Sequence, residues 1–379
     1  MSETLRRRAP LLGWIALVVV LLLLPLYLEE FWLQSGLFAM AFAIAAIGLT
    51  ILVGTTGQLS LGHAFFVAIG AYGYCYLAGG EDVPGLKATS GLELPPVLAM
   101  AGAIALAALA GALFSPIAGR LRGIYLGLAS LGLVFLGQHI MFNAADITGG
   151  FNGRDATPFS IAGFTFADGD PDLTVLGVEF GGLEKLWYLG LAMLVFAAWV
   201  ARNIVGTRPG RALETIRDSA VAAATMGVDV RAYRAGAFMV SSAYAGAGGA
   251  LIALVFGRIV PESFGFVLSV EFLVMVVIGG LGSIYGAVAG AVLVSMLPRV
   301  LDNYSDSLPL VSEPGTGGVG PSQASRFIYG LAIILVLVYA PRGLAGLTQR
   351  WRRRRGREPP SPAPAQAPAG PVTATPSVP

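Results

Sequence analysis

Long runs of apolar residues alternate along the chain with shorter polar stretches. Most runs hold roughly 15 to 25 residues, the length that a helix needs to cross about 30 Å of hydrocarbon. The pattern therefore predicts an all-α polytopic membrane protein with about ten transmembrane helices. The predicted spans are Leu11–Leu28, Gly36–Val53, Leu59–Ala78, Leu94–Ile117, Gly123–Phe142, Leu186–Asn203, Ala232–Phe256, Val267–Leu281, Ile284–Leu297 and Arg326–Ala340.

The count of spans depends on whether the short runs cross the membrane and on whether the first run is retained. The eighth and ninth runs are short, and if short runs are re-entrant the count falls to eight or nine. The first run follows Arg6–Arg8, as in a signal peptide, but Glu29 and Glu30 come after it without a small-residue cleavage pattern. We interpret it as a retained first span.

Composition supports a membrane protein and excludes several other classes. Of the 379 residues, 55% are hydrophobic and only 12% are charged, about half the charged share of a typical soluble domain. The single cysteine, Cys75, excludes a disulfide framework, and two histidines leave little for a metal cluster. Neither Lys87 nor Lys185 stands in a Walker A sequence, so an ATPase that drives this protein would be another chain. We predict no enzymatic role, no metal and no directly bound cofactor.

The distribution of charge predicts the topology. Most arginines fall on one side of the membrane when the N-terminus is cytoplasmic, and most acidic residues fall on the other, so we expect both termini inside. Residues 1–10 are then a cytoplasmic N-terminus and residues 11–346 the transmembrane domain. Residues 143–185 form an ordered outer cap and residues 302–325 a second outer loop. Residues 347–379 combine a basic juxtamembrane cluster with a disordered tail rich in proline and alanine.

One polar stretch between spans, residues 205–231, has helical character. Pro209 stands near its first helical position and Gly227 at its end. Its charged residues gather on one helical face, and small or apolar residues gather opposite them. The charged set includes Arg208, Arg211, Glu214, Arg217 and Asp218; the apolar set is Ala212, Leu213, Ile216, Ala220 and Ala223. Such a helix is either a basic loop that sets orientation or a docking element for a soluble partner.

Two glycine-broken pairs of apolar segments suggest an internal repeat. Ile51–Tyr72 and Val276–Ser295 both read apolar, Gly-x-x-Gly, polar and then glycine-rich apolar. Paired interruptions of this kind are typical of the repeated, often inverted, halves of a transporter, and we predict an inverted repeat. The alternative is that the glycines serve close helix packing.

Few polar side chains lie inside the apolar runs, where they are costly unless they face a cavity or a partner. Glu271 is the one we favour as functional, although Arg258 and Glu262 could pair with it near the outer surface. For the serine, threonine, glutamine and histidine residues the alternative is a bond to neighbouring backbone. The candidate substrate-pathway residues are Gln58, Ser60, His63, Ser130, Gln138, Glu271, Gly279 and Gly282.

Several of these blocks resemble the branched-chain amino acid permease family of bacterial ABC importers. The run Val221-Ala222-Ala223, followed after three residues by Gly227, is similar to the EAA…G coupling segment of importer permeases, with Val221 at the acidic position of the motif. The blocks GQLSLGHAFF, GGLGS and LRGIYLGLASLGLVFLGQHIMFNAADITGGFNG also match the family in order. Together the similar blocks cover roughly Gly36–Gly346.

The resemblance implies a type II-like ABC importer permease fold in the bacterial inner membrane. It implies a heterodimer with a second, related permease chain, two ATP-binding subunits that use the ATP, and an external substrate-binding protein. The substrate would be leucine, isoleucine or valine. The segment around Ala222, Ala223 and Gly227 would dock in a groove of the ATP-binding subunit. Alternatives are a urea or short-amide permease of the same family, or a secondary transporter in which Glu271 or His139 couples ions.

Overall fold

The structure is a computed structural model that describes residues 20–80, 90–121, 123–168, 173–175, 178–304, 321–339 and 343–346. The predicted cytoplasmic N-terminus, the first half of the predicted first span, most of the predicted second outer loop and the C-terminal tail lie outside these residues. The first described turn, η1 (Leu24–Leu26), leads into the helical bundle at α2.

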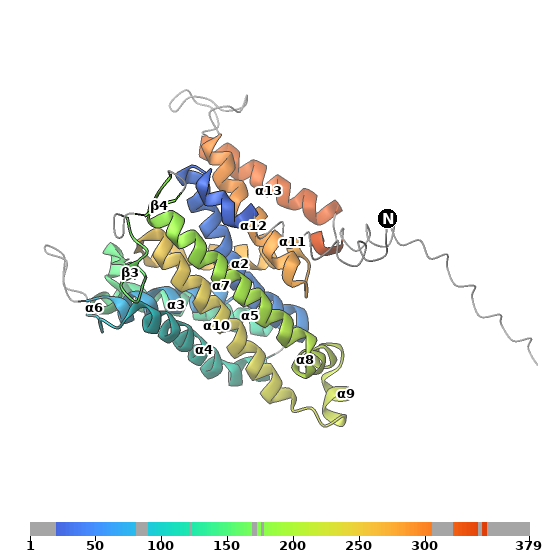
Figure 1. The fold of residues 1–379 in the computed structure, drawn as a ribbon. Coiled ribbons are helices and arrows are strands. Elements are labelled where there is room, and N and C mark those ends of the chain that lie inside the picture. The colour runs from blue at the N-terminus through green and yellow to red at the C-terminus, as the bar shows by residue number, and fades with distance from the viewer. Residues whose placement is uncertain are drawn as a thin grey trace, which may run out of the picture.

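Nine helices of 14 residues or more build the described part of the bundle (Figure 1). Six are long and apolar enough to cross a membrane, and two further apolar helices, α3 and α11, are shorter. The helices are α2 (Glu30–Thr56), α3 (His63–Ala78), α4 (Pro96–Arg120), α5 (Ile124–Asn143), α7 (Gly182–Gly206), α10 (Val230–Phe256), α11 (Phe266–Gly279), α12 (Ile284–Asn303) and α13 (Pro321–Tyr339), with the short pair α8 (Arg208–Asp218) and α9 (Ala220–Thr225) between α7 and α10. The prediction of an all-α polytopic membrane protein is confirmed.

Helix ends depart from the predicted spans where polar residues continue a helix. The second span is longer than predicted, because the Thr55 and Thr56 hydroxyls bond to carbonyls one turn back and do not end α2. The ninth was expected to stop at Leu297, yet α12 continues through Pro298 to Asn303. Within a bundle, neighbouring helices make a proline tolerable at such a position.

At the end of the bundle where α5 finishes and α7 begins, the chain forms small local structures. They are α6 (Ala145–Thr148), η2 (Gly150–Asn152), the hairpin β2 (Ser160–Ile161) with β3 (Phe164–Thr165), and the hairpin β4 (Leu173–Val175) with β5 (Val178–Phe180). β1 (Arg154–Asp155) pairs antiparallel with β6 (Arg258–Ile259), which follows α10. We call this end of the bundle the cap end.

The core lies around α2 and α10, which small residues bring close to their neighbours. In α2, 89% of the most apolar stretch is buried, because other helices surround it on every side. A Cβ added at Gly70 of α3 would lie 2.2 Å from the Gly246 carbonyl oxygen of α10. One added at Gly249 would lie 2.0 Å from the Val67 carbonyl oxygen. These helices therefore touch backbone to backbone.

The two glycine-broken segments of the sequence each form two helices joined by a turn, α2–α3 and α11–α12, which we call the first and second hairpins. In the second, α11 packs on α12, whereas in the first α3 packs mainly on α4 and α10 rather than on α2. The first hairpin turns at residues 57–62, which are not helical, so α3 begins at His63 and not at Leu59 as predicted. Gly57 has φ +68°, a left-handed conformation that ends α2. The second hairpin turns at residues 280–283.

Both hairpins point the same way in the bundle. Gly54, in the last turn of α2, touches Gly282 in the second turn, while the Arg299 guanidinium of α12 lies 3.8 Å from the centre of the Phe38 ring near the start of α2. Hence α12 runs antiparallel beside α2, and the turns of both hairpins lie at the same end of the bundle. The inverted relation that the sequence suggested does not describe this pair of segments.

Candidate functional site

The polar segment between α7 and α10 forms two short helices at the end of the bundle opposite the cap end (Figure 1). The sequence predicted one continuous helix, but the chain breaks at Ser219, which has extended backbone angles (φ −157°, ψ 109°). The Ser219 hydroxyl accepts a hydrogen bond from the Ala222 amide and so caps the start of α9. A serine that offers this bond favours a helix start over a helix interior.

The predicted amphipathic faces are present on α8. Leu213 and Ile216 are buried where α8 packs on α2, α7 and α10, and Ala223 of α9 is buried as well. Arg208, Arg211 and Glu214 of α8 are exposed, and so are Asp218 and Ala222. The apolar face thus holds the segment on the bundle, and its charged face remains accessible.

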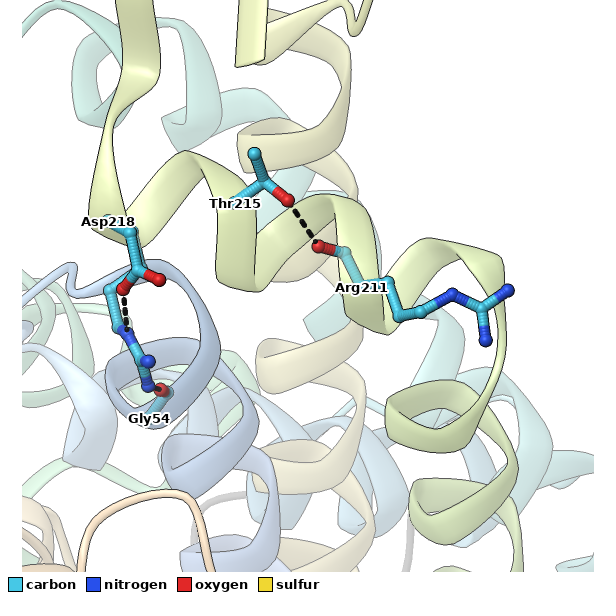
Figure 2. A network of polar contacts seen from close by, with 5 residues as sticks. Gly54, Arg211, Thr215 and Asp218 are labelled. Carbon is cyan, nitrogen blue, oxygen red and sulfur yellow. Dashed lines mark hydrogen bonds and ion pairs between the residues drawn. The ribbon is translucent and has the colours of Figure 1, made fainter. Parts of the chain in front are cut away.

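Arg217 departs from this division, because it reaches from α8 back to the bundle. Its Nη1 donates a hydrogen bond of 2.8 Å to the Gly54 carbonyl oxygen, and its Nε donates to Asp218 Oδ1 at 3.2 Å. The dashed lines at Asp218 and Gly54 in Figure 2 mark these two bonds, while Arg211 points away from both labelled residues. The Arg217 side chain is 45% exposed, so the contact lies at the edge of the bundle.

The Gly54 carbonyl is one of the last in α2, and such carbonyls have no partner within their own helix. The amide that would follow in the helix, that of Gln58, bonds instead to the Thr56 hydroxyl at 3.2 Å. Arg217 therefore caps the C-terminus of α2 and places a positive charge where the helix dipole is negative. A residue of the short helix pair is bonded to the end of the central helix.

The same point of α2 meets the turn of the second hairpin. A Cβ at Gly54 would lie 2.5 Å from both the Cα and the N of Gly282, so only glycine permits this approach. Gly282 has φ +81°, and Gly280, two residues earlier, has φ +106°. A Cβ at Gly343, after α13, would lie 2.5 Å from the Gly280 Cα. We call these four residues, Gly54, Gly280, Gly282 and Gly343, the glycine junction.

The short helix α9 presents apolar side chains to the outside. Val221 and Met226 are each 76% exposed. Gly227 follows with φ +82°, and no heavy atom lies within 4 Å of where its Cβ would be. The glycine is required by the left-handed turn that reverses the chain from α9 to α10, not by close packing.

Four of the predicted pathway residues lie in the core near the first turn and bond to backbone. Gln58 Nε2 donates to the Ala118 carbonyl at 3.3 Å, and His63 Nε2 lies 2.8 Å from the Ala45 carbonyl oxygen. The Ser130 hydroxyl accepts from the Leu61 amide at 2.9 Å, and the Ser60 hydroxyl from the Gly62 amide at 3.3 Å. These contacts connect the turn to α2, α4 and α5.

The remaining predicted residues divide between two places. Gly279 and Gly282 lie at the turn of the second hairpin, where a Cβ at Gly279 would be 2.2 Å from the Gly286 carbonyl oxygen. Gln138 and Glu271 line one cavity of about 640 Å³ near the cap end, together with Glu262. The expected Arg258 partner is not there, since Arg258 pairs with Asp155 at 3.0 Å.

Sequence reasoning missed two features of this arrangement. It grouped Arg217 with the exposed charges, and nothing in the spacing indicated a bond to a residue 163 positions away. It also missed Arg154 of β1, which is 3% exposed and donates to the Ile147 carbonyl under the Tyr76 ring. Burial lowers the pKa of the Arg154 guanidinium. A lone arginine in a loop gives no sign of such burial.

Comparison with known families gives a match over most of the chain. Residues 32–337 match the model of a family described as branched-chain amino acid transport system, permease component. The match includes both hairpins, the α8–α9 segment and the cavity near the cap end.

Similar proteins carry names that agree with this match. The chain is 28% identical over 345 residues to the high-affinity branched-chain amino acid transport system permease protein LivM of Escherichia coli, covering 88% of this chain and 75% of that protein. It is 24% identical over 329 residues to the corresponding protein BraD of Pseudomonas aeruginosa, covering 84% and 96%. A probable permease LivM of Methanocaldococcus jannaschii is 26% identical over 252 residues, covering 65% and 67%. No solved structure matches the chain.

Proposed function

The chain belongs to the family of branched-chain amino acid transport system permease components, and we propose that it is the membrane subunit of an importer driven by separate ATPase subunits. Members of this family are multi-pass inner-membrane transport components and not enzymes. In this proposal the chain translocates leucine, isoleucine, valine or a related amino acid. ATP is bound and hydrolysed by partner chains.

The observation that carries the proposal is the α8–α9 segment. It stands at the end of the bundle opposite the cap end, holds to the bundle by Leu213 and Ile216, and exposes Val221 and Met226. In this proposal Val221 and Met226 are the apolar contacts that the segment makes with the ATPase subunit. Because Val221 stands where the motif has an acidic residue, the exposed surface of α9 is apolar. Charged residues of α8 lie beside it, namely Arg208, Arg211 and Glu214.

The connection of this segment to the bundle supplies a route for movement. A force on α9 passes to α8, because the two helices are joined at Ser219 without an intervening loop. From α8 it passes through the Arg217 bond to the end of α2 at Gly54. Gly54 touches the turn between α11 and α12, so both hairpins meet the segment at the glycine junction.

The same proposal assigns partners to the two ends. ATPase subunits dock at α8–α9 on the cytoplasmic side, which places both termini of the chain in the cytoplasm, and a substrate-binding protein delivers amino acid at the cap end. A second, related permease chain completes the membrane unit. The basic residues around α8 agree with a cytoplasmic position.

Reconstitution tests the proposal. The chain is purified with its co-purifying subunits, placed in proteoliposomes, and leucine uptake is measured with a loaded binding protein and ATP. We expect uptake that requires both ATP and the ATPase chains, and Met226→Asp should release the ATPase from the complex without preventing membrane insertion. Glu29→Gln, at the far end of the bundle, is the matched control.

Two results would overturn this function. One is uptake by the chain alone that follows a proton or sodium gradient without ATP, which would indicate a secondary transporter. The other is labelling of α9 from outside the cell, which would place the segment where no ATPase subunit can reach it.

A further inference from the structure

The cavity near the cap end has the size and lining of a ligand site. Its volume is about 640 Å³, within the usual range for small-molecule pockets. It lies between the outer end of α10, the turn η3 (Pro261–Phe264), the start of α11 and parts of α2 and α5. The lining is mostly apolar and includes five phenylalanines, Phe42, Phe142, Phe256, Phe264 and Phe266.

The charged lining of this cavity is acidic. Glu262 and Glu271 both line it, and among the residues that the structure describes no lysine or arginine does. Neither carboxylate takes part in a salt bridge within the described part of the chain, and Arg258, which precedes Glu262 by four residues, pairs with Asp155. Glu271 is half-buried on α11, so an incoming cation would face a carboxylate that is only partly hydrated. Such a carboxylate attracts cations more strongly than one in bulk water.

Two neutral polar groups complete the lining. Gln138 Nε2 contacts the Pro261 carbonyl at 3.5 Å, which leaves its second N–H available, and the Ser263 hydroxyl belongs to an exposed residue. Both can donate a hydrogen bond to an oxygen. The cavity therefore offers acceptors for a cation, neutral donors for an oxygen anion, and aromatic walls for an aliphatic group.

The aromatic walls are held in place by further rings. Phe42 packs edge-on against Phe272 with ring centres 5.5 Å apart, and Phe256 against Phe38 at 4.6 Å. Phe272 and Phe38 are fully buried. Edge-to-face pairs of this kind fix ring orientation, so the walls are formed before a ligand arrives.

We propose that this cavity receives the amino acid substrate, with its ammonium group at Glu271 and Glu262 and its aliphatic side chain against Phe42, Phe256 and Phe264. The assignment rests on the proposed import function and adds the site. The substrate carboxylate takes the donors of Gln138 and Ser263. Glu271 lies on α11, whose other end is the second hairpin turn, so the site and the glycine junction share one 14-residue helix.

Thiol labelling of the purified complex tests the site without depending on transport. The native Cys75 is buried and Val267 is an exposed residue of the cavity lining with no assigned substrate contact, so the Val267→Cys variant carries a single accessible thiol within the described residues. We expect leucine to slow its reaction with a maleimide, and 4-methylpentanoate, which lacks the ammonium group, to protect far less. Labelling of a Glu30→Cys variant, exposed at the same end but outside the cavity, should not respond to leucine.

A carboxylate variant then tests the ammonium contact. In the Val267→Cys background, Glu271→Gln should raise the leucine concentration for half-protection at least about tenfold, since it removes one charged partner of the pair. Glu262→Gln should raise it less, because that residue is exposed. Glu30→Gln is the control for the loss of one negative charge.

The outcomes separate the site from the importer function. Unchanged labelling with leucine, or equal protection by leucine and 4-methylpentanoate, overturns the site even when wild-type uptake requires ATP. Uptake without ATP, with leucine protection intact, overturns the energy source and leaves the site standing.

Discussion

Replacing Arg217 by methionine removes the cap from the end of α2 while keeping a long apolar side chain. The free energy lost can be estimated from the contacts of Arg217. A hydrogen bond from a charged donor contributes about 1.5–3 kcal/mol, and we take about 1 kcal/mol because the Arg217 side chain is 45% exposed. The favourable charge at a helix C-terminus adds about 0.5 kcal/mol. The total of about 1.5 kcal/mol corresponds to roughly a tenfold change in the population of the state in which α8 is held to the end of α2.

The assay measures two rates in proteoliposomes that contain the chain, its ATPase subunits and a loaded binding protein. For Arg217→Met we expect ATPase subunits to remain bound and to hydrolyse ATP, while leucine uptake per ATP falls about tenfold. Uptake per ATP in Arg217→Lys should lie between the values for the wild type and Arg217→Met, because lysine keeps the positive charge but lacks the planar guanidinium group. Arg202→Met removes an exposed arginine near the end of α7 that leads into α8 and serves as the control. Equal uptake per ATP in Arg217→Met and Arg202→Met would refute the route through Gly54.

Three further substitutions test separate parts of the fold. Gly227→Val should lower uptake because φ +82° strains a β-branched residue by about 1–3 kcal/mol, whereas Gly227→Asn should keep most of it; equal uptake in both would assign the glycine another role. Gly249→Ala should lower the melting temperature of the purified protein, since its Cβ would meet the Val67 carbonyl, while Gly132→Ala, with no atom within 4 Å, should not; equal melting temperatures would contradict backbone contact between α3 and α10. Tyr244→Phe should cost about 1 kcal/mol of stability by losing the 2.8 Å bond to the Ala197 carbonyl, and an unchanged unfolding midpoint would argue against that bond.

Apolar periodicity and turn residues predicted the helical part of the fold well. Runs such as those of α4, α5 and α10 have ends within a few residues of the predicted ones, because each helix must bury its backbone polar groups along the whole apolar run. Prediction erred where a local cap or turn interrupts a helix. The Ser219 cap splits the segment between α7 and α10, and the left-handed turn at Gly57 delays the start of α3.

The candidate site was less accessible to sequence reasoning because its contacts join distant parts of the chain. The faces of α8 follow from local spacing and were predicted, but the bond from Arg217 to Gly54 depends on how α8 lies against α2. Likewise, Glu271 and Gln138 were singled out as polar residues in apolar runs, yet only the packing of α5 beside η3 brings them to one cavity. Which polar residue faces a cavity is decided by tertiary contacts.

The glycine junction has a consequence for genetic repair. At most packed positions, a larger residue on one helix is rescued by a smaller residue on the facing helix. Where Gly54 meets Gly282, the facing atoms are backbone atoms of a glycine, and no smaller residue exists. A screen for second-site suppressors of Gly54→Ala should therefore recover none at position 282. Any suppressors should lie in residues that reposition the α11–α12 turn as a unit.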